Sequence, residues 1–252
     1  MAPLVTHLVV GERVFAQLRQ FDPAAYGSFL LGCVLVDVNG FSDIDRRTTH
    51  FVGRLHEDGA DAFRKSCTNF LAQLDALLVR PWCELTQHEQ AFVAGYLCHL
   101  AVDEVWKRLG QDVMLALGID SLADTPVPGE VFMTAFDVAS SEMYIDFSSV
   151  SSELDAASIP NVLTHVPYAI FQTMWRIVKP HVMDGRTVES YFEMIKRLGR
   201  TPSQVQTVRR KHKAYWEDTV TWIAELGGVE PYILNATQRS LEVLPRLWAL
   251  LA

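Results

Sequence analysis

The sequence has little of what marks secreted or membrane-spanning proteins. Four of its 252 residues are cysteines, and no two of them have C-x-x-C spacing, so we expect reduced, buried thiols and a cytoplasmic protein. Its longest apolar runs, Leu30–Val36 and Ala91–Val102, fall well short of the roughly 20 residues of a membrane-spanning helix. The N-terminus lacks the basic region and cleavage site of a signal peptide.

Basic residues and flexible linkers are also scarce. Lys and Arg number 22 against 30 Asp and Glu, which gives a net charge of −8 and argues against a general nucleic-acid clamp. A metal ion inside the fold would reverse that sign locally. No Gly/Ser/Pro-rich stretch divides the chain and 49% of it is apolar, so we expect one domain over residues 1–252.

The apolar residues repeat with the period of a helix, which predicts a compact all-α fold of seven to nine helices. The clearest helix begins at a capping box, Thr86 with Glu89, and should end at Gly110. Ser140–Ser158 is rich in polar residues, which predicts a surface loop or lid with a short hairpin. Other expected helices cover 7–20 (capped by Thr6), 59–79, 164–182, 187–198, 202–226 and 231–250. Within the single domain we therefore expect three parts: a metal-site half (1–110), a loop- or lid-like segment (111–160) and C-terminal helices (161–252).

The helix over 87–109 contains an anomaly. Its inward stripe is Phe92, Tyr96, His99, Asp103 and Trp106, so two ionisable side chains lie four residues apart on an apolar face. Burying a carboxylate there costs several kcal/mol unless it is compensated. Either a His–Asp hydrogen bond within the core or a cation bound by both side chains would compensate it.

Three further residues favour the cation. Asp37 follows the apolar run Leu30–Val36, His50 ends the polar loop after it, and His7 lies in the first turn of the first helix. Imidazole and carboxylate ligands suit zinc, although ligand type leaves manganese and iron open. Four of the other histidines suit structural roles at helix ends or on a solvated basic face: His88, His165, His181 and His212. His56, six residues after His50, suits the same pocket and an exposed loop equally well.

Several common enzyme signatures are absent from the sequence. No Glu is followed three residues later by His, as in ferritin-like di-iron bundles, and no His is followed directly by Asp, as in HD-type phosphohydrolases. The chain also lacks a zincin motif, a Gly-x-Ser-x-Gly elbow and a Walker loop. Serine-hydrolase and P-loop functions are therefore disfavoured.

Four segments of the sequence together resemble the zinc-dependent phospholipase C family, which is related in fold to the S1/P1 nucleases. They are Thr6–Val14, Phe29–Asp37, Thr49–Phe51 and Gly95–Trp106, and their order and spacing are similar to the family's over about residues 1–110. The resemblance implies an all-helical domain whose zinc cluster hydrolyses phosphodiesters.

By position, the resemblance implies that Asp37, His50, His99 and Asp103 hold one metal ion. It also implies that His7, with Asp103 as a bridge, helps to hold a second. Family members with three metals have two more histidines soon after the H-x-x-x-D helix, but this chain has no histidine between Asp103 and Asn161. We therefore expect one or two ions.

Two functions follow from these expectations. The first is a zinc-dependent phosphodiesterase acting on a phospholipid-like or small phosphodiester, with Asp37 orienting or deprotonating the attacking water. The alternative is a non-catalytic, metal-stabilised helical scaffold or regulatory protein, in which chelation lowers stability without loss of an activity.

Overall fold

Eleven α-helices make up most of the described chain. The computed structural model describes residues 3–52, 65–117, 125–183 and 187–249. Its α-helices are α1 (Leu4–Phe15), α2 (Tyr26–Val34), α3 (Arg46–His50), α5 (Ser66–Leu77), α6 (Gln87–Leu117), α7 (Gly129–Ser141), α8 (Phe147–Ala156), α9 (Tyr168–Met183), α10 (Val188–Arg197), α11 (Pro202–Glu225) and α12 (Glu230–Ala249). In these residues, extended pairing is limited to one isolated bridge between Leu78 and Leu163. The expected all-α class is confirmed.

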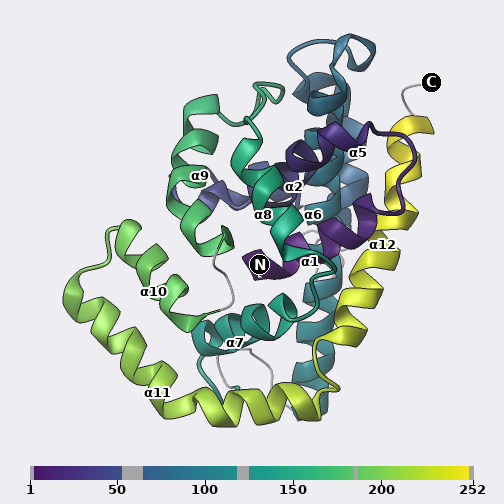
Figure 1. Ribbon diagram of the computed structural model, residues 1–252. Helices are drawn as coiled ribbons and strands as arrows, with labels where there is room; N and C mark the ends of the chain where they lie inside the picture. Colours follow the sequence, from purple (N-terminus) through teal and green to yellow (C-terminus); the bar gives the residue numbers. More distant parts are fainter. Residues whose placement is uncertain (1–2, 53–64, 118–124, 184–186, 250–252) are drawn as a thin grey trace.

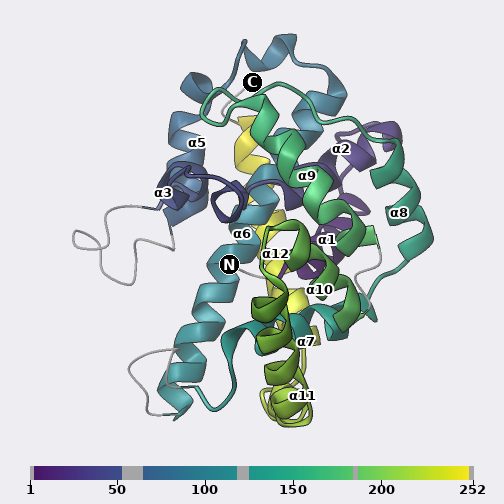
Figure 2. The ribbon, with the colours of Figure 1, turned by 90° about the vertical axis from the view of Figure 1, so that its left-hand side faces the viewer.

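Helix α6 is the central element of the arrangement. It runs the height of the molecule, with α2 packed across it and α12 alongside it (Figures 1 and 2). Helix α1 contacts α2, α6, α7 and α12, and α11 packs against α7 along the lower edge of Figure 1. No helix in the described ranges combines the length and the apolar character needed to cross a bilayer.

The crossing of α2 and α6 depends on two glycines. A Cβ atom at Gly32 would lie 2.1 Å from the carbonyl oxygen of Phe92, and one at Gly95 would lie 2.0 Å from that of Phe29. Both distances are far below van der Waals contact, so the two backbones meet at a separation that only glycine permits. This close approach brings the end of α2, and Asp37 just beyond it, against the middle of α6.

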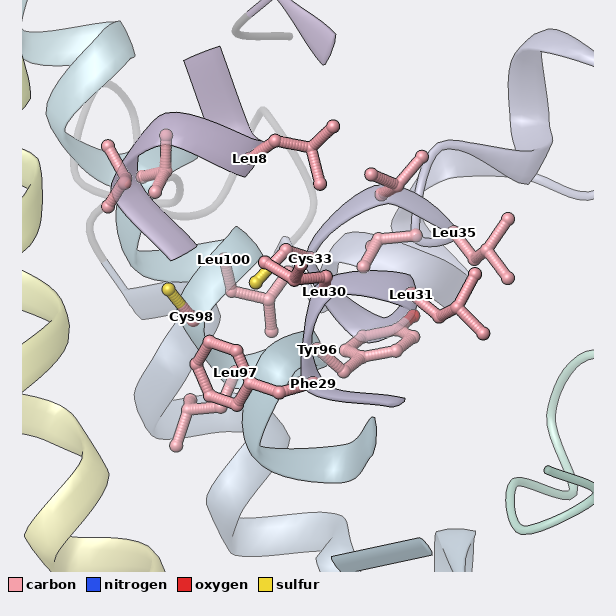
Figure 3. Packing of buried hydrophobic residues seen from close by; sticks show 14 of the residues in the cluster. Leu8, Phe29, Leu30, Leu31, Cys33, Leu35, Tyr96, Leu97, Cys98 and Leu100 are labelled. Atoms are coloured by element: carbon pink, nitrogen blue, oxygen red, sulfur yellow. The ribbon is translucent and has the colours of Figure 1, made fainter. Parts of the chain in front are cut away.

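Apolar side chains close around this crossing. Figure 3 shows Phe29, Leu30 and Leu31 from α2 beside Tyr96 and Leu97 from α6. All five are fully or almost fully buried, in one hydrophobic cluster that reaches from α1 to α12. The metal-site candidates on α6, and Asp37 just after α2, therefore lie beside a fully buried helix crossing.

The first helix begins earlier than the sequence predicts. It starts at Leu4 after the extended residue Pro3, and it ends at Phe15 rather than near Gln20. Thr6 is not its cap. The backbone N–H of Thr6 donates to Asp137 Oδ1 (2.9 Å), so a carboxylate from α7 satisfies one of the free amides of the first turn.

Gly110 does not end α6, which continues to Leu117. A glycine stops a helix only where the backbone turns left-handed, and the described glycines with positive φ are Gly199, Gly227 and Gly228. Inside a helix, glycine costs only about 1 kcal/mol. The expected start is confirmed, because Thr86 N donates to Glu89 Oε2 (2.8 Å) and Glu89 N donates to Thr86 Oγ1 (3.3 Å).

The expected loop or lid over Ser140–Ser158 is wrong. Helix α7 extends to Ser141, and α8 covers Phe147–Ala156. The side chain of Asp146 caps α8 by accepting from Ser149 N (3.1 Å). The serines and acidic residues that suggest a loop lie partly at this helix start, where they are favourable, and partly on its exposed side.

Of the remaining expectations about helices, loops and cysteines, some are confirmed and others are wrong. The four C-terminal helices are present within a few residues of their expected bounds, and the helix expected at 59–79 is described from Ser66 onward, its earlier part lying outside the described residues. The expected polar loop up to His50 contains the short helix α3. The four cysteines are free, but Cys83 is exposed rather than buried.

Candidate metal centre

Three helices place the candidate ligands. Asp37 follows α2 and precedes a single 3-10 turn, and His50 is the last residue of α3. His99 and Asp103 lie one turn apart on the same face of α6. The α2–α6 crossing thus brings His99 and Asp103 of α6 close to Asp37, which lies just beyond the end of α2.

The four side chains converge. His50 Nε2 lies 3.0 Å from Asp37 Oδ1 and 3.4 Å from Asp103 Oδ2, and His99 Nε2 lies 3.7 Å from Asp37 Oδ2. One ligand atom from each of the four residues lies within 4.8 Å of all the others. Every one of these residues is buried. Four ligand atoms at such spacing can hold a metal ion.

Both imidazoles of this group present a lone pair to it. His99 Nδ1 lies 2.8 Å from the carbonyl oxygen of Cys33, which can only accept, so Nδ1 carries the proton. His50 Nδ1 lies 2.8 Å from Thr49 Oγ1, whose hydroxyl donates to the carbonyl of Arg46 (3.2 Å), so here too Nδ1 is the donor. Such partners for the outer nitrogen fix the ring and its tautomer at metal sites.

Several inward atoms of the group have no hydrogen-bond partner. They are both oxygens of Asp37 and the Nε2 atoms of His50 and His99, all of which are buried. Leaving such atoms unsatisfied costs about 1–3 kcal/mol each, and more for a charged group. A cation at their common focus would satisfy them together. Two imidazole nitrogens and two carboxylate oxygens fit zinc, and manganese and iron use the same ligand types.

His7 lies beside this group rather than within it. Its ring stacks on that of His99, with centroids 3.8 Å apart and an interplanar angle of 3°. Its Nε2 lies 3.7 Å from Asp103 Oδ1, the oxygen that faces away from His50. Both of its ring nitrogens are buried without a hydrogen-bond partner. Asp103 therefore faces His7 with one oxygen and His50 with the other.

Sequence reasoning missed Arg46. Its Nη2 donates to Asp103 Oδ2 (2.5 Å), and its Nη1 lies 3.8 Å from Asp37 Oδ1. The signal that could have found it is its spacing, because Arg46 and His50 are four residues apart and share one face of α3. Because Asp43–His50 was expected to be a polar loop, a spacing of four residues did not indicate that the two side chains share a face.

Burial governs the charge states around the group. Burial lowers the pKa of His99. It also lowers the pKa of His7, where the neighbouring His99 ring lowers it further. Both rings are therefore neutral near pH 7. Burial raises the pKa of Asp37, but the facing imidazoles of His99 and His50 outweigh it and hold the pKa below its usual range. Burial also lowers the pKa of Lys107, one turn beyond Asp103, to about 8.

A left-handed residue supports His50. Phe51, which ends α3, has φ 53°, a conformation that a large side chain rarely adopts. Its N–H donates to the carbonyl of Arg47 (3.0 Å), and its own carbonyl accepts from Asn69 Nδ2 (2.8 Å). These bonds hold the chain in a strained turn directly after a candidate ligand, as is common at functional sites.

The other histidines lie away from the group, and His56 lies outside the described residues. His88 bonds Ser28 on an exposed part of α6, and His165 bonds the hydroxyl of Tyr96 just before α9. The solvated face expected for His212 is wrong, since this ring is 3% exposed. It packs between Tyr191, Phe192 and Trp216.

Comparison with protein-family models, with curated proteins and with solved structures found no match for this chain. The site's geometry and the sequence resemblance are what bear on its function.

Proposed function

We propose that this protein is a zinc-dependent phosphodiester hydrolase of the phospholipase C type, acting on a phospholipid-like or small phosphodiester. The observation that carries the proposal is the convergence of Asp37, His50, His99 and Asp103. The inward atoms of Asp37, His50 and His99 have no hydrogen-bond partner. That observation supports metal binding. The phosphodiester part of the proposal rests on the resemblance of residues 1–110 to the family.

The four residues of the group would hold the first ion, and His7 with Asp103 Oδ1 would help to hold a second. A bound zinc ion supplies Lewis acidity, which lowers the pKa of water and offsets the charge of a phosphoryl group. Because the pKa of Asp37 lies below its usual range, this carboxylate is a weak base at neutral pH. We assign it to orienting water rather than to removing its proton.

Metal analysis and a hydrolysis assay on the same samples test the proposal. Purified protein should contain one or two zinc ions per chain and should cleave bis(4-nitrophenyl) phosphate or a short-chain phosphatidylcholine. His99→Ala should lose both the ion and the turnover. The matched control is His88→Ala, which removes an exposed histidine from the same helix and should change neither. A zinc-loaded protein that is inert toward a broad phosphodiester panel would contradict catalysis.

The burial of the group favours a second candidate, a metal-stabilised scaffold without catalytic activity. The side chains of Asp37, His50, His99 and Asp103 are at most 2% exposed, which is typical of closed structural metal sites. In that case chelation would lower the melting temperature of a protein that has no turnover to lose. Turnover proportional to zinc content would exclude the scaffold.

A further inference from the structure

The charges around the group point to a ligand beyond the metal ion. Two carboxylates, with two imidazoles that would each bind an ion through an Nε2 lone pair, contribute −2, and Arg46 adds +1 at hydrogen-bond distance from Asp103. One divalent ion would therefore leave the centre with a net charge of +1. Such a centre attracts an anion, although the whole chain carries −8.

Arg46 is also the member of this cluster that reaches solvent. Its side chain is 25% exposed, whereas those of Asp37 and Asp103 are at most 2% exposed. A guanidinium has five N–H donors. Within the described residues, one of them bonds Asp103, while Nη1 is 3.8 Å from Asp37 and too far for a hydrogen bond. The remaining donors are available to an incoming ligand.

The backbone fixes the place of this side chain. Arg46 is the first residue of α3, whose start is capped by Asp45, and its carbonyl accepts from the Thr49 hydroxyl that orients His50. The guanidinium and the metal-facing imidazole are therefore held by the same short helix. A ligand that bonds Arg46 would lie beside the ion.

We propose that Arg46 binds a non-bridging oxygen of the substrate's phosphoryl group at the solvent side of the metal centre. This inference rests on the proposed function and names the residue that recognises its substrate. Arginine suits this role because its planar fork matches two oxygens of a phosphate at once.

Titration of the zinc-loaded protein with inorganic phosphate tests the inference by calorimetry. Arg46→Gln should weaken phosphate binding by about tenfold or more, the loss expected for a charge-assisted hydrogen bond. Arg46→Lys should be intermediate because it keeps the charge without the fork. The matched control is Arg47→Gln, since Arg47 is the exposed neighbour that pairs with Asp45, and it should bind phosphate as the wild type does.

Zinc content and thermal unfolding, measured on every variant, separate binding from folding. If Arg46→Gln keeps its zinc and binds phosphate as tightly as the wild type, Arg46 is only a counter-ion and the inference is wrong. If Arg46 proves necessary for phosphate binding but the wild type cleaves no diester, the proposed catalysis fails, and the part of the inference that stands is that Arg46 binds a phosphoryl oxygen beside the ion. A wild type that takes up no zinc, or that binds no phosphate when loaded, overturns the inference.

Discussion

At the scale of single residues, the outer nitrogens of His50 and His99 decide what the group can do. Each Nδ1 donates to an oxygen outside the group, so each Nε2 presents a lone pair to the carboxylates. In these tautomers Nε2 is the atom that can bind an ion. The partner of His50 is a side chain, Thr49, and it can be changed without touching a ligand.

Thr49→Val tests this orientation, because valine has nearly the shape of threonine but offers no acceptor to His50 Nδ1. We expect zinc affinity to fall by about 10- to 100-fold, the usual effect of removing a partner of a ligand. Competition with a fluorescent zinc chelator measures it. Thr48→Val is the control, since Thr48 is exposed and should leave the affinity unchanged. Equal affinities in both variants would show that the Thr49 hydroxyl does not orient His50.

His165 predicts a dependence of stability on pH. The Tyr96 hydroxyl donates to the carbonyl of Thr49 (2.6 Å), so it must accept from His165 Nε2 (3.1 Å), and Nδ1 is left buried without a partner. Burial lowers the pKa of His165 to about 4, from 6.5. Below pH 6.5 the unfolded chain therefore binds a proton that the folded chain does not, and stability is lost as the pH falls toward 4.

His165→Gln keeps a donor for Tyr96 but cannot titrate. Between pH 7.5 and pH 5 its free energy of unfolding should fall less than that of the wild type, by on the order of 1–2 kcal/mol. Urea unfolding at the two pH values measures the difference. An identical fall in both proteins would mean that the His165 ring is protonated as easily in the folded state as in the unfolded chain.

At the scale of elements, the α2–α6 crossing sets the spacing of the ligands. Asp37 comes from the chain just after α2, while His99 and Asp103 come from α6. The same crossing puts the carbonyl of Cys33 within 2.8 Å of His99 Nδ1. Any widening of the crossing would therefore move Asp37, and it would also move the Cys33 carbonyl that orients His99.

Gly32→Ala should widen the crossing. Its Cβ would lie 2.1 Å from the backbone oxygen of Phe92, and backbone cannot move aside as a flexible side chain can. We expect a loss of about 1–3 kcal/mol or more in the free energy of unfolding, together with weaker zinc binding. Gly129→Ala is the control, because nothing lies within 4 Å of a Cβ there. Wild-type stability in Gly32→Ala would mean that the helices can separate without cost.

The sequence allows some elements to be predicted and not others, for physical reasons. The start of α6 was predictable because its capping box is local, formed by residues three apart. The start of α1 was not, since Asp137, which satisfies Thr6, is more than a hundred residues away. Helix α8 was missed because its polar composition suits both a loop and a half-exposed helix, and only packing decides between them.

At the scale of the whole molecule, the candidate site is built from residues that lie far apart in the sequence, after α2, in α3 and in α6. His99 and Asp103 were predictable as a pair because helical spacing places them on one face. Their meeting with Asp37 and His50 is tertiary, and the sequence suggested it only through the placement of these residues beside an apolar run and a polar loop and through the resemblance to the family. Arg46 was missed because its segment was expected to be a loop, and its bond to Asp103 is likewise tertiary.

Binding of an ion at this position should stabilise the entire fold, since its ligands join α2, α3 and α6. At a free zinc concentration about 100 times the dissociation constant, linkage adds about 2.7 kcal/mol to the free energy of unfolding. For a chain of this size that corresponds to a rise of about 5–10 °C in melting temperature, which a chelator should reverse. Calorimetric or fluorimetric melting curves with and without zinc measure the shift. His99→Ala should remove it and His88→Ala should retain it; a shift that survives His99→Ala would place the stabilising ion away from the four converging ligands.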